Sequence, residues 1–239
     1  MRDKFRSKYS GIGNGFASAY SSSVVKIVFE NDRFLAVDKP AGYLSIPSRA
    51  GKADLRPCLH QLLESQAGKK ILPVHRLDVE VSGLVLFAKD AQAHRDANGW
   101  FESRSIKKSY EAWSEGAAPP TDEPQLWESL LVRGKRRTFE SPHGKPSVTR
   151  AFWLRSRNLN GAQIQVWRLE PLTGRSHQLR VELAKRGNPI VGDKLYGAVS
   201  SFHGGAIALR AVKVSFENCA GALEYGLPQE IAVEGLSDV

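Results

Sequence analysis

The sequence predicts an α+β fold built around a mostly antiparallel sheet. Residues 148–154, 163–169 and 207–216 alternate apolar and polar residues, as expected for half-buried strands. Few helical patterns separate the strand-like segments, which argues against the regular strand–helix–strand repeat of a parallel sheet. A large sheet accompanied by a small number of helices is therefore expected.

The first half of the chain supplies further strands. Residues 24–29 and 34–37 are rich in β-branched and aromatic residues, and they flank a turn-like Glu-Asn-Asp segment. A loop is expected at residues 39–42, Lys-Pro-Ala-Gly. Residues 84–88 form a short, continuous apolar run, which is typical of a buried strand.

Three helices are expected. Residues 54–66 carry leucines at helical spacing, and Pro57 is tolerated in the first turn of a helix. Residues 91–103, which lead toward a basic Lys-Lys pair, are expected to form the second helix. Residues 176–185 are expected to form the third, with Ser176 as its N-cap and a Gly-Asn-Pro segment after its end.

The length and composition are those of an ordinary globular protein, with 239 residues of which 41% are hydrophobic and 25% charged. We expect one domain over residues 24–239, preceded by a flexible basic tail rich in glycine and serine over residues 1–23. The formal net charge of +9 favours a polyanionic partner, chiefly a nucleic acid.

Other classes of protein are disfavoured. Cys58 and Cys219 lie far apart in the sequence, without histidines at zinc-binding spacing, so neither a metal site nor a disulfide scaffold is expected. No apolar run has the length of a membrane span, and the first residues lack the apolar stretch of a secretory signal. We expect a cytoplasmic protein that does not bind membranes.

The first candidate for chemistry is Asp78, which ends the segment His-Arg-Leu-Asp at residues 75–78. It precedes a buried strand, where a neighbouring cation could hold its carboxylate ionised and available as a nucleophile or base. For an isolated Arg-x-Asp, a solvated ion pair in a loop would be the simpler interpretation. A second long motif, at residues 171–197, changes this assessment.

Together the two motifs resemble the RluA-like family of RNA pseudouridine synthases. That family carries His-Arg-Leu-Asp followed by Ser-Gly, later Thr-Gly-Arg-(Ser/Thr)-His-Gln-(Leu/Ile)-Arg-Val, and then Gly-x-Pro-Ile-x-Gly-Asp and a tyrosine. The matching residues here are 75–83, 173–181 and 187–196. Two long motifs in the right order are far more specific than one short pattern. Many family members also carry an S4 RNA-binding domain, for which residues 1–23 are too short and too rich in glycine.

The resemblance implies a reaction and three catalytic residues. Pseudouridine formation breaks the C–N glycosidic bond of a uridine, rotates the uracil and rejoins it through carbon, with no metal or other cofactor. By resemblance, Asp78 is the nucleophile and Arg180 is its ion-pair partner. Tyr110, in a Lys-x-Tyr-x-Ala strand, stacks on the target uracil and has its hydroxyl placed for proton transfer.

Four of the expected RNA-binding residues belong to these motifs. By resemblance, Arg76 enters the RNA helix in place of the flipped base, or else it contacts a phosphate. His75 is expected to orient the loop rather than to titrate during the reaction. Arg175 and His177 precede a predicted helix, and phosphates bind readily at helix N-termini.

Two lysines complete the expected RNA surface. Lys108 belongs to the strand of Tyr110, and Lys145 belongs to a Gly-Lys-Pro-Ser-Val-Thr segment similar to another strand of the family. Before Lys145 comes the basic run at residues 133–137, which is either a phosphate-contacting edge or a solvated turn.

Three positions depart from the family pattern. Glu182 and Arg210 stand where the family usually has histidines, and Val81-Ser82 replaces the usual Thr-Ser. None of these is a proposed catalytic residue, but the departures leave the details of the pocket and the identity of the RNA open.

The sequence therefore predicts a monomeric RNA pseudouridine synthase that acts on structured ribosomal or transfer RNA. The alternative is a catalytically silent RNA-binding or RNA-folding protein of the same architecture, although binding alone would not require a carboxylate facing RNA phosphates. A metal-dependent hydrolase using His75 and Asp78 is disfavoured, because no further ligand lies at metal-binding spacing.

Overall fold

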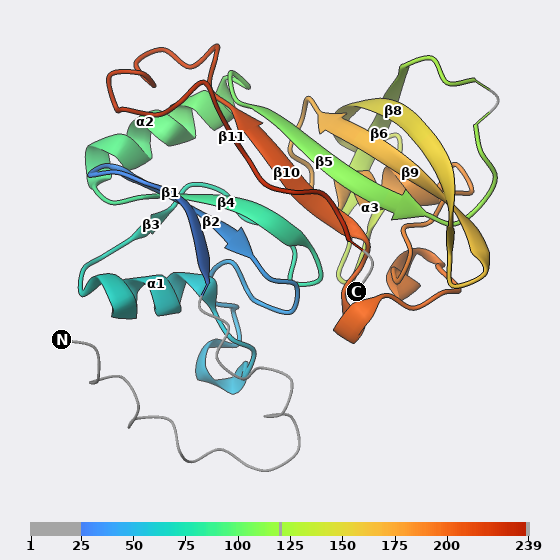
Figure 1. Ribbon diagram of the computed structural model, residues 1–239, viewed down its shortest axis with the longest axis horizontal. Helices are drawn as coiled ribbons and strands as arrows, with labels where there is room; N and C mark the ends of the chain where they lie inside the picture. The colour runs from blue at the N-terminus through green and yellow to red at the C-terminus, as the bar shows by residue number, and fades with distance from the viewer. Residues whose placement is uncertain (1–24, 120, 238–239) are drawn as a thin grey trace.

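A computed structural model describes residues 25–119 and 121–237, so the predicted tail at residues 1–23 lies outside the described part. Within it, eleven strands form one sheet in the order β1-β2-β4-β10-β5-β9-β8-β6-β7, with β3 beside β4 and β11 beside β10 (Figure 1). The elements are β1 (Lys26–Glu30), β2 (Phe34–Lys39), α1 (Leu59–Ala67), β3 (Leu72–Pro73), β4 (Ser82–Ala88), α2 (Ala91–Glu102), β5 (Lys107–Ser114), β6 (Gln125–Arg133), β7 (Thr138–Glu140), β8 (Lys145–Leu159), β9 (Ala162–Pro171), α3 (Gln178–Ala184), β10 (Leu209–Ser215) and β11 (Glu230–Ala232), with short 3-10 turns at Gly51–Ala53, Lys194–Tyr196 and His203–Gly205.

The predicted α+β fold with a mostly antiparallel sheet is confirmed. Every strand pairing in the described residues is antiparallel except that of β4 with β10, where Ser82 and Gly83 pair with Arg210 and Ala211. The predicted strands at 148–154 and 163–169 are the central parts of β8 and β9, which pair along most of their length.

Strand β4 is apolar and buried from Leu84 to Ala88 because helices cover both of its faces. Val85 belongs to the core cluster that contains Leu59 of α1, whereas Leu86 belongs to the cluster that contains Ala97 of α2. Since successive side chains of a strand point to opposite faces, the two helices pack on opposite sides of the sheet. This packing fixes the position at which β4 begins. The predicted nucleophile, Asp78, lies four residues before the first residue of that strand.

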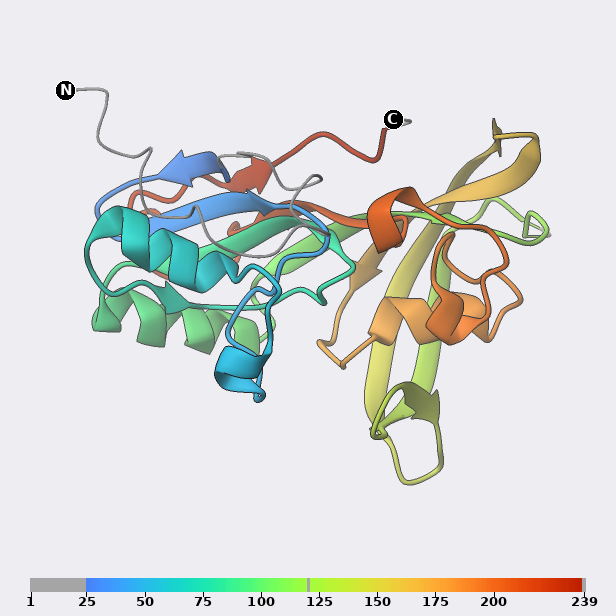
Figure 2. The same cartoon turned by 90° about the horizontal axis from the view of Figure 1, so that it is seen from below.

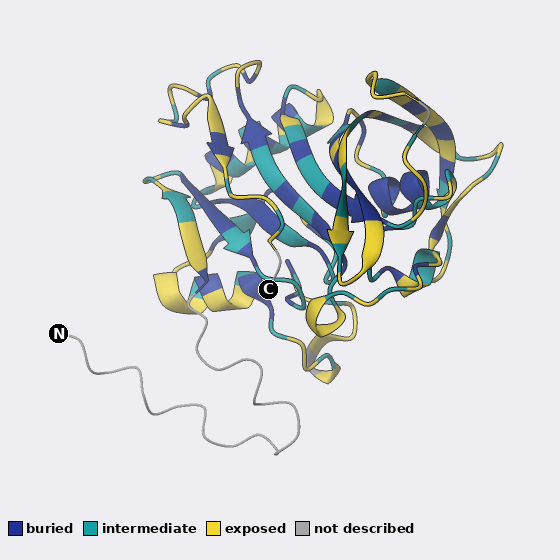
Figure 3. Ribbon diagram, turned by 45° about the vertical axis from the view of Figure 1, so that its right-hand side comes forward, coloured by how far each residue is buried: buried dark blue, intermediate teal, exposed yellow. Residues whose placement is uncertain are grey.

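The second half of the sheet curves around α3. Strands β6, β8 and β9 bend about this helix in Figure 2, and Figure 3 shows the helix as buried within the curve. The six residues from Gln178 to Leu183 are all buried, including three that are polar or charged. A polar side chain enclosed in this way requires a bonding partner inside the protein.

Two of the three predicted helices begin later than expected. Helix α1 starts at Leu59 rather than at residue 54, and Leu55 lies outside it with 87% of its surface exposed. The preceding segment is held extended, because the amide of Leu44 donates to the carbonyl of Pro57 and the amide of Leu59 donates to the carbonyl of Leu44.

The start of α3 was also predicted wrongly. The helix begins at Gln178, and the N-cap position belongs to His177 rather than Ser176. His177 has a φ of 51°, a left-handed conformation that is uncommon for residues other than glycine. The side chain of Gln178 organises the turn instead, since its Oε1 accepts from the amide of Arg175 and the hydroxyl of Thr173.

Both cysteines lie in the interior. Cys58 and Cys219 are buried free thiols, and burial raises the pKa of Cys219 to about 11, so its thiol stays protonated at neutral pH. Among the helices of the described residues, none is long and apolar enough to cross a membrane.

The close approach of β4 and β10 yields a prediction about Gly83. Its φ is 109°, and an added Cβ would overlap the backbone of Ala211. Gly83→Ala should therefore lower the free energy of unfolding by about 3 kcal/mol or more. Gly161→Ala is the matched control, because Gly161 also has positive φ but faces open space, so only the backbone cost of about 1–2 kcal/mol applies. Denaturant unfolding of both variants measures the difference, and equal losses would contradict the steric argument.

Candidate active site

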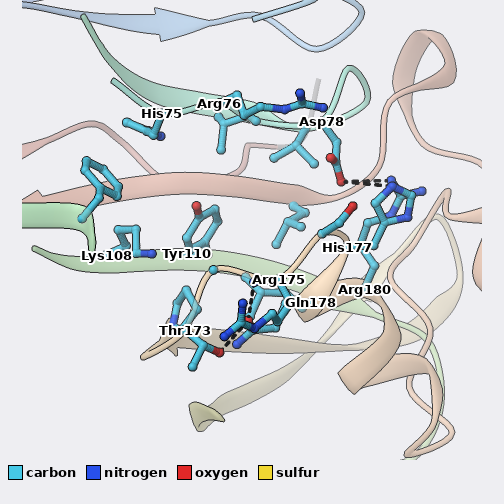
Figure 4. Close-up of a pocket in the computed structure, with 18 residues that line it drawn as sticks. His75, Arg76, Asp78, Lys108, Tyr110, Thr173, Arg175, His177, Gln178 and Arg180 are labelled. Carbon is cyan, nitrogen blue, oxygen red and sulfur yellow. Dashed lines mark hydrogen bonds and ion pairs between the residues drawn. The ribbon is translucent and has the colours of Figure 1, made fainter. Parts of the chain in front are cut away.

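A cleft of about 510 Å³ opens where the two halves of the sheet meet (Figure 4). One wall is the loop between β3 and β4, the floor is β5, and the other wall is the loop that leads into α3. Eight of the nine residues predicted to act in the site line this cleft, namely His75, Arg76, Asp78, Lys108, Tyr110, Arg175, His177 and Arg180. The ninth, Lys145, lies outside it.

The centre of the site is Arg180, whose side chain is only 2% exposed. Two of its nitrogens bind the carboxylate of Asp193, with distances of 2.7 Å from Nε to Oδ2 and 2.8 Å from Nη2 to Oδ1. Its remaining Nη1 lies 3.3 Å from Oδ2 of Asp78 and 3.4 Å from Oε2 of Glu80. The predicted contact between Arg180 and Asp78 is therefore present, while the strongest contact of the guanidinium is with Asp193.

This arrangement keeps Arg180 charged inside the protein. Burial acts to lower the pKa of Arg180, but the hydrogen bonds and charge of Asp193, together with the charges of Glu80 and Asp78, outweigh burial and raise it above its ordinary value. Asp193 is 1% exposed, whereas Asp78 keeps a quarter of its side chain accessible. Asp193 thus holds the guanidinium of Arg180 in a fixed orientation, with its Nη1 directed at the accessible carboxylate of Asp78.

His177 provides a second neighbour of Asp78. Its Nε2 lies 3.9 Å from Oδ2 of Asp78, and its Nδ1 lies 3.0 Å from the hydroxyl of Tyr196. The same hydroxyl accepts from the amide of Thr138 and donates to the carbonyl of Thr138. Burial lowers the pKa of His177 in spite of the nearby Asp78 charge, so the imidazole is mainly neutral at pH 7.

Two side chains of β5 form the floor of the cleft. Lys108 and Tyr110 are two residues apart on one strand and share a face, so both point into the cavity (Figure 4). Burial, with a further contribution from the charge of Asp78, raises the pKa of Tyr110, so its phenol remains protonated. Burial also lowers the pKa of Lys108, whose ammonium lies 5.6 Å from the centre of the Phe101 ring.

Hydrogen bonds from Lys39 and Ser45 hold the backbone of the loop that carries Asp78. The fully buried ammonium of Lys39 donates to the carbonyls of Pro40, Tyr43 and Val79 at 2.8–3.3 Å. Burial lowers the pKa of Lys39 to about 8. Ser45 donates to the carbonyl of Leu77 and accepts from the amide of the same residue, so the backbone on both sides of Asp78 is held in place.

His75 is part of the framework of this loop. Its Nε2 accepts from the amide of Leu86 at 3.0 Å, and its ring stacks on Phe101 with a centroid distance of 5.0 Å. Burial lowers the pKa of His75 to about 3, so the imidazole is neutral at physiological pH. This geometry agrees with the expected role of orienting the loop, whereas its expected contact with RNA stays a prediction.

The remaining cations occupy the rim. Arg76 is exposed at the mouth of the cleft, and Arg175 is half-buried with its Nε donating to the carbonyl of Pro146. Lys145 is exposed at the start of β8 and lines a neighbouring pocket together with Arg133. The structure therefore places the expected RNA-binding residues at the cleft, except Lys145, which lies at the start of β8 beside the β6–β7 hairpin.

Two of the three departures from the family pattern lie away from the cleft, whereas Val81, which belongs to the third, lines it. Glu182 is fully buried and binds Arg186, four residues later in the chain, at 2.5 Å. Arg210 binds Asp38 at 2.6 Å and donates to the carbonyl of Glu234. Neither residue lines the cavity, while Val81 is buried at its edge.

Asp193, Tyr196 and Glu80 were not assigned roles from the sequence. Asp193 and Tyr196 belong to the second motif, and Asp193 follows an apolar Pro-Ile-Val segment and a glycine. An acidic residue directly after such a segment is a candidate for a buried charge, and a buried charge requires a cationic partner. In the described residues, no group of three or more His, Cys, Asp or Glu side chains is arranged to hold a metal ion.

Comparison with known proteins gives consistent similarities. Residues 33–185 match the family described as RNA pseudouridylate synthase. The dual-specificity RNA pseudouridine synthase RluA of Vibrio vulnificus is 38% identical over 202 residues, which cover 80% of this chain and 77% of that protein. The protein of the same name from Vibrio parahaemolyticus is 37% identical over 175 residues, covering 71% and 68%. The solved structure of human RNA Pseudouridylate Synthase Domain Containing 1 has the same fold, with a TM-score of 0.69, 24% identity, and coverage of 90% of this chain and 91% of that one.

The buried pair gives a prediction for Arg180→Lys. An ammonium cannot reproduce the two parallel bonds to Asp193, so a buried carboxylate would lose a donor. The free energy of unfolding should fall by about 2–4 kcal/mol. Arg210→Lys is the matched control, because Arg210 also binds one aspartate but is partly exposed outside the cleft, and it should lose no more than about 1 kcal/mol. Similar losses measured by denaturant unfolding would contradict a special role for the Arg180 pair.

The lowered pKa of His75 predicts an acid-sensitive loop. The folded protein holds this imidazole neutral down to about pH 3, whereas an unfolded chain protonates it near pH 6.5. Its contribution to stability is therefore complete above pH 6.5 and is lost as the pH falls toward 3, by up to about 1.4 kcal/mol per pH unit. His75→Gln keeps an acceptor for Leu86 but cannot titrate. Unfolding measured between pH 7 and 4.5 should show a steeper loss in the parent protein, and parallel curves would disprove the assignment.

Proposed function

This chain belongs to the RNA pseudouridylate synthase family, as its motifs predict, and we propose that Asp78 is the nucleophile with which it isomerises uridine in RNA. One observation carries the proposal for Asp78. It is the only acidic side chain among the described residues that line the cleft. It is also partly exposed, so a substrate can reach it, and it lies 3.3 Å from a buried guanidinium.

The proposed reaction needs no external reactant. Asp78 adds to the target nucleotide, at either the ribose or the uracil ring, and the bond between C1′ and N1 breaks. The freed uracil turns within the cleft, and a new bond forms between C1′ and C5. The proton on C5 then leaves, N1 carries a proton in the product, and Asp78 is released unchanged, so substrate and product are isomers.

The neighbouring residues support these steps. Arg180, held by Asp193, stabilises the carboxylate of Asp78 before attack and after release. Tyr110 faces the same cavity, where its ring can stack on the uracil. Because its phenol is protonated, we assign it a relay in which the hydroxyl gives up its proton only as it receives another. Arg76, exposed at the mouth, is suited to fill the space that a flipped nucleotide leaves in the RNA.

The proposed substrate is a structured ribosomal or transfer RNA, bound by a monomer in the cytoplasm. The net charge of +9 favours binding to folded RNA, and the names of two relatives contain the words dual-specificity. The test is a map of pseudouridines in ribosomal and transfer RNA from cells with and without the gene. Loss of at least one site on deletion, restored by the purified enzyme in vitro, is the expected result. RNA binding without any change in pseudouridine would favour a catalytically silent RNA-binding protein.

The role of Asp78 predicts a separation of binding from turnover. Asp78→Asn removes the nucleophile but leaves the basic surface intact, so turnover should fall at least about a thousandfold while RNA affinity stays within about twofold. Glu80→Gln is the control, because Glu80 also contacts Arg180 but does not line the cleft, and most activity should remain. Single-turnover pseudouridine formation and a binding titration provide both numbers. Near-normal turnover by Asp78→Asn would overturn the proposal.

A further inference from the structure

A second cavity, of about 280 Å³, adjoins the active-site cleft. Its walls come from the base of the β6–β7 hairpin, the start of β8 and the loop before α3, and its polar lining residues are Arg133, Thr138, His143, Lys145, Arg175 and Ser176. Arg175 and Ser176 also line the cleft, so the two cavities share a wall. This second cavity is called the hairpin pocket below.

The hairpin pocket has the charge of an anion site. Three of its lining residues are permanent cations, and none of its described lining residues is acidic. Within the described residues, Arg133 and Arg175 use one nitrogen each to bind a backbone carbonyl, and no carboxylate forms an ion pair with either of them or with Lys145. Cations that are not neutralised inside the protein are available to a negatively charged ligand.

Thr138 gives an independent indication of a ligand. Its residue is only 2% exposed, and its Oγ1 is a buried polar atom without a hydrogen-bond partner among the described residues. Its backbone amide and carbonyl, in contrast, are both bound to the hydroxyl of Tyr196. A buried hydroxyl left without a partner costs stability, so its presence in the wall of a cationic pocket calls for an explanation.

We propose that the hairpin pocket is a second RNA subsite, which binds one sugar-phosphate unit of the strand that delivers the target uridine to Asp78. This inference rests on the proposed function of the cleft and adds a contact to it. The shared wall at Arg175 and Ser176 places the pocket beside the path of a strand that enters the cleft. Its volume suits a ribose and a phosphate rather than a stacked pair of bases.

The hairpin pocket is also held at a defined position relative to the nucleophile. Tyr196 binds the backbone of Thr138 on one side and His177 on the other, and His177 lies beside Asp78. Two hydrogen bonds, from the backbone of Thr138 to Tyr196 and from Tyr196 to His177, therefore connect the subsite to an imidazole that lies 3.9 Å from the carboxylate of Asp78. Such a connection would fix the phosphate of one nucleotide and the sugar of the next in a productive geometry.

Thr138→Val is the most discriminating variant. Valine has nearly the same shape and suits a strand, and it removes only the hydroxyl that lacks a partner. The melting temperature should stay the same or rise, while RNA affinity should fall by a factor of about 3 to 10. A hydroxyl with a purely structural role would produce the opposite pair of results, a lower melting temperature and unchanged affinity.

The contribution of the pocket cations to RNA binding is tested with Lys145→Ala and a matched control, Arg150→Ala. Both residues are exposed on β8, but only Lys145 lines the hairpin pocket. Binding of ribosomal and transfer RNA from cells lacking the gene is measured over a range of salt concentrations. Lys145→Ala should reduce the slope of log affinity against log salt by about 0.7–0.9, whereas Arg150→Ala should leave it nearly unchanged.

The two proposals fail in distinguishable ways. Binding is measured in the Asp78→Asn background, which cannot turn over, and pseudouridine formation is measured separately with an intact Asp78. Unchanged affinity for Thr138→Val, together with equal salt slopes for Lys145→Ala and Arg150→Ala, would overturn the subsite even if the enzyme is active. An absence of pseudouridine formation with the expected binding defects would overturn the proposed function and leave the subsite standing.

Discussion

The buried contact between Arg180 and Asp193 is the interaction on which the site depends. A charged side chain inside the protein is stable only when its hydrogen-bonding groups are satisfied, and Asp193 satisfies two of the nitrogens of Arg180. The third nitrogen is thereby directed at Asp78, across the boundary between the two halves of the sheet. The curve of β6, β8 and β9 encloses α3, the helix that carries Arg180, and Arg180 also lines the cleft.

The loop of Asp78 is built in a complementary way. Its shape is maintained by backbone groups bound to Lys39 and Ser45 and by the acceptor that His75 offers to Leu86, so these contacts, rather than the side chain of the proposed nucleophile Asp78, hold the loop. A reactive residue benefits from this division, because other groups fix its backbone while its carboxylate stays partly exposed beside Arg180. As a consequence, few other residues can replace a buried polar residue such as Lys39 without loss of stability.

Much of the architecture could be predicted from the sequence because alternation reveals strands and long motifs reveal the family. The cleft could also be assembled in advance, since Asp78, Tyr110 and Arg180 each lie in a motif. The start of α3 and the partner of Arg180 could not, because both depend on tertiary contacts. Gln178 replaces Ser176 in organising the turn, and its side-chain amide nitrogen is held by the carbonyl of Val148 and the hydroxyl of Thr149 on a distant strand. Asp193 reaches Arg180 only after the chain beyond α3 folds back. Local patterns carry no information on such long-range pairs.

The position of β10 in the sheet has a consequence for how the protein is made. This strand lies between β4 and β5, yet it is translated after every other strand on the main path of the sheet. Until it emerges from the ribosome, the half that carries Asp78 and the half that carries Arg180 have no strand to join them. The pairing is distant in the chain and therefore slow to form. We expect the nascent chain to remain unable to modify RNA until β10 has been made, because this strand joins the two halves of the sheet between which the cleft lies.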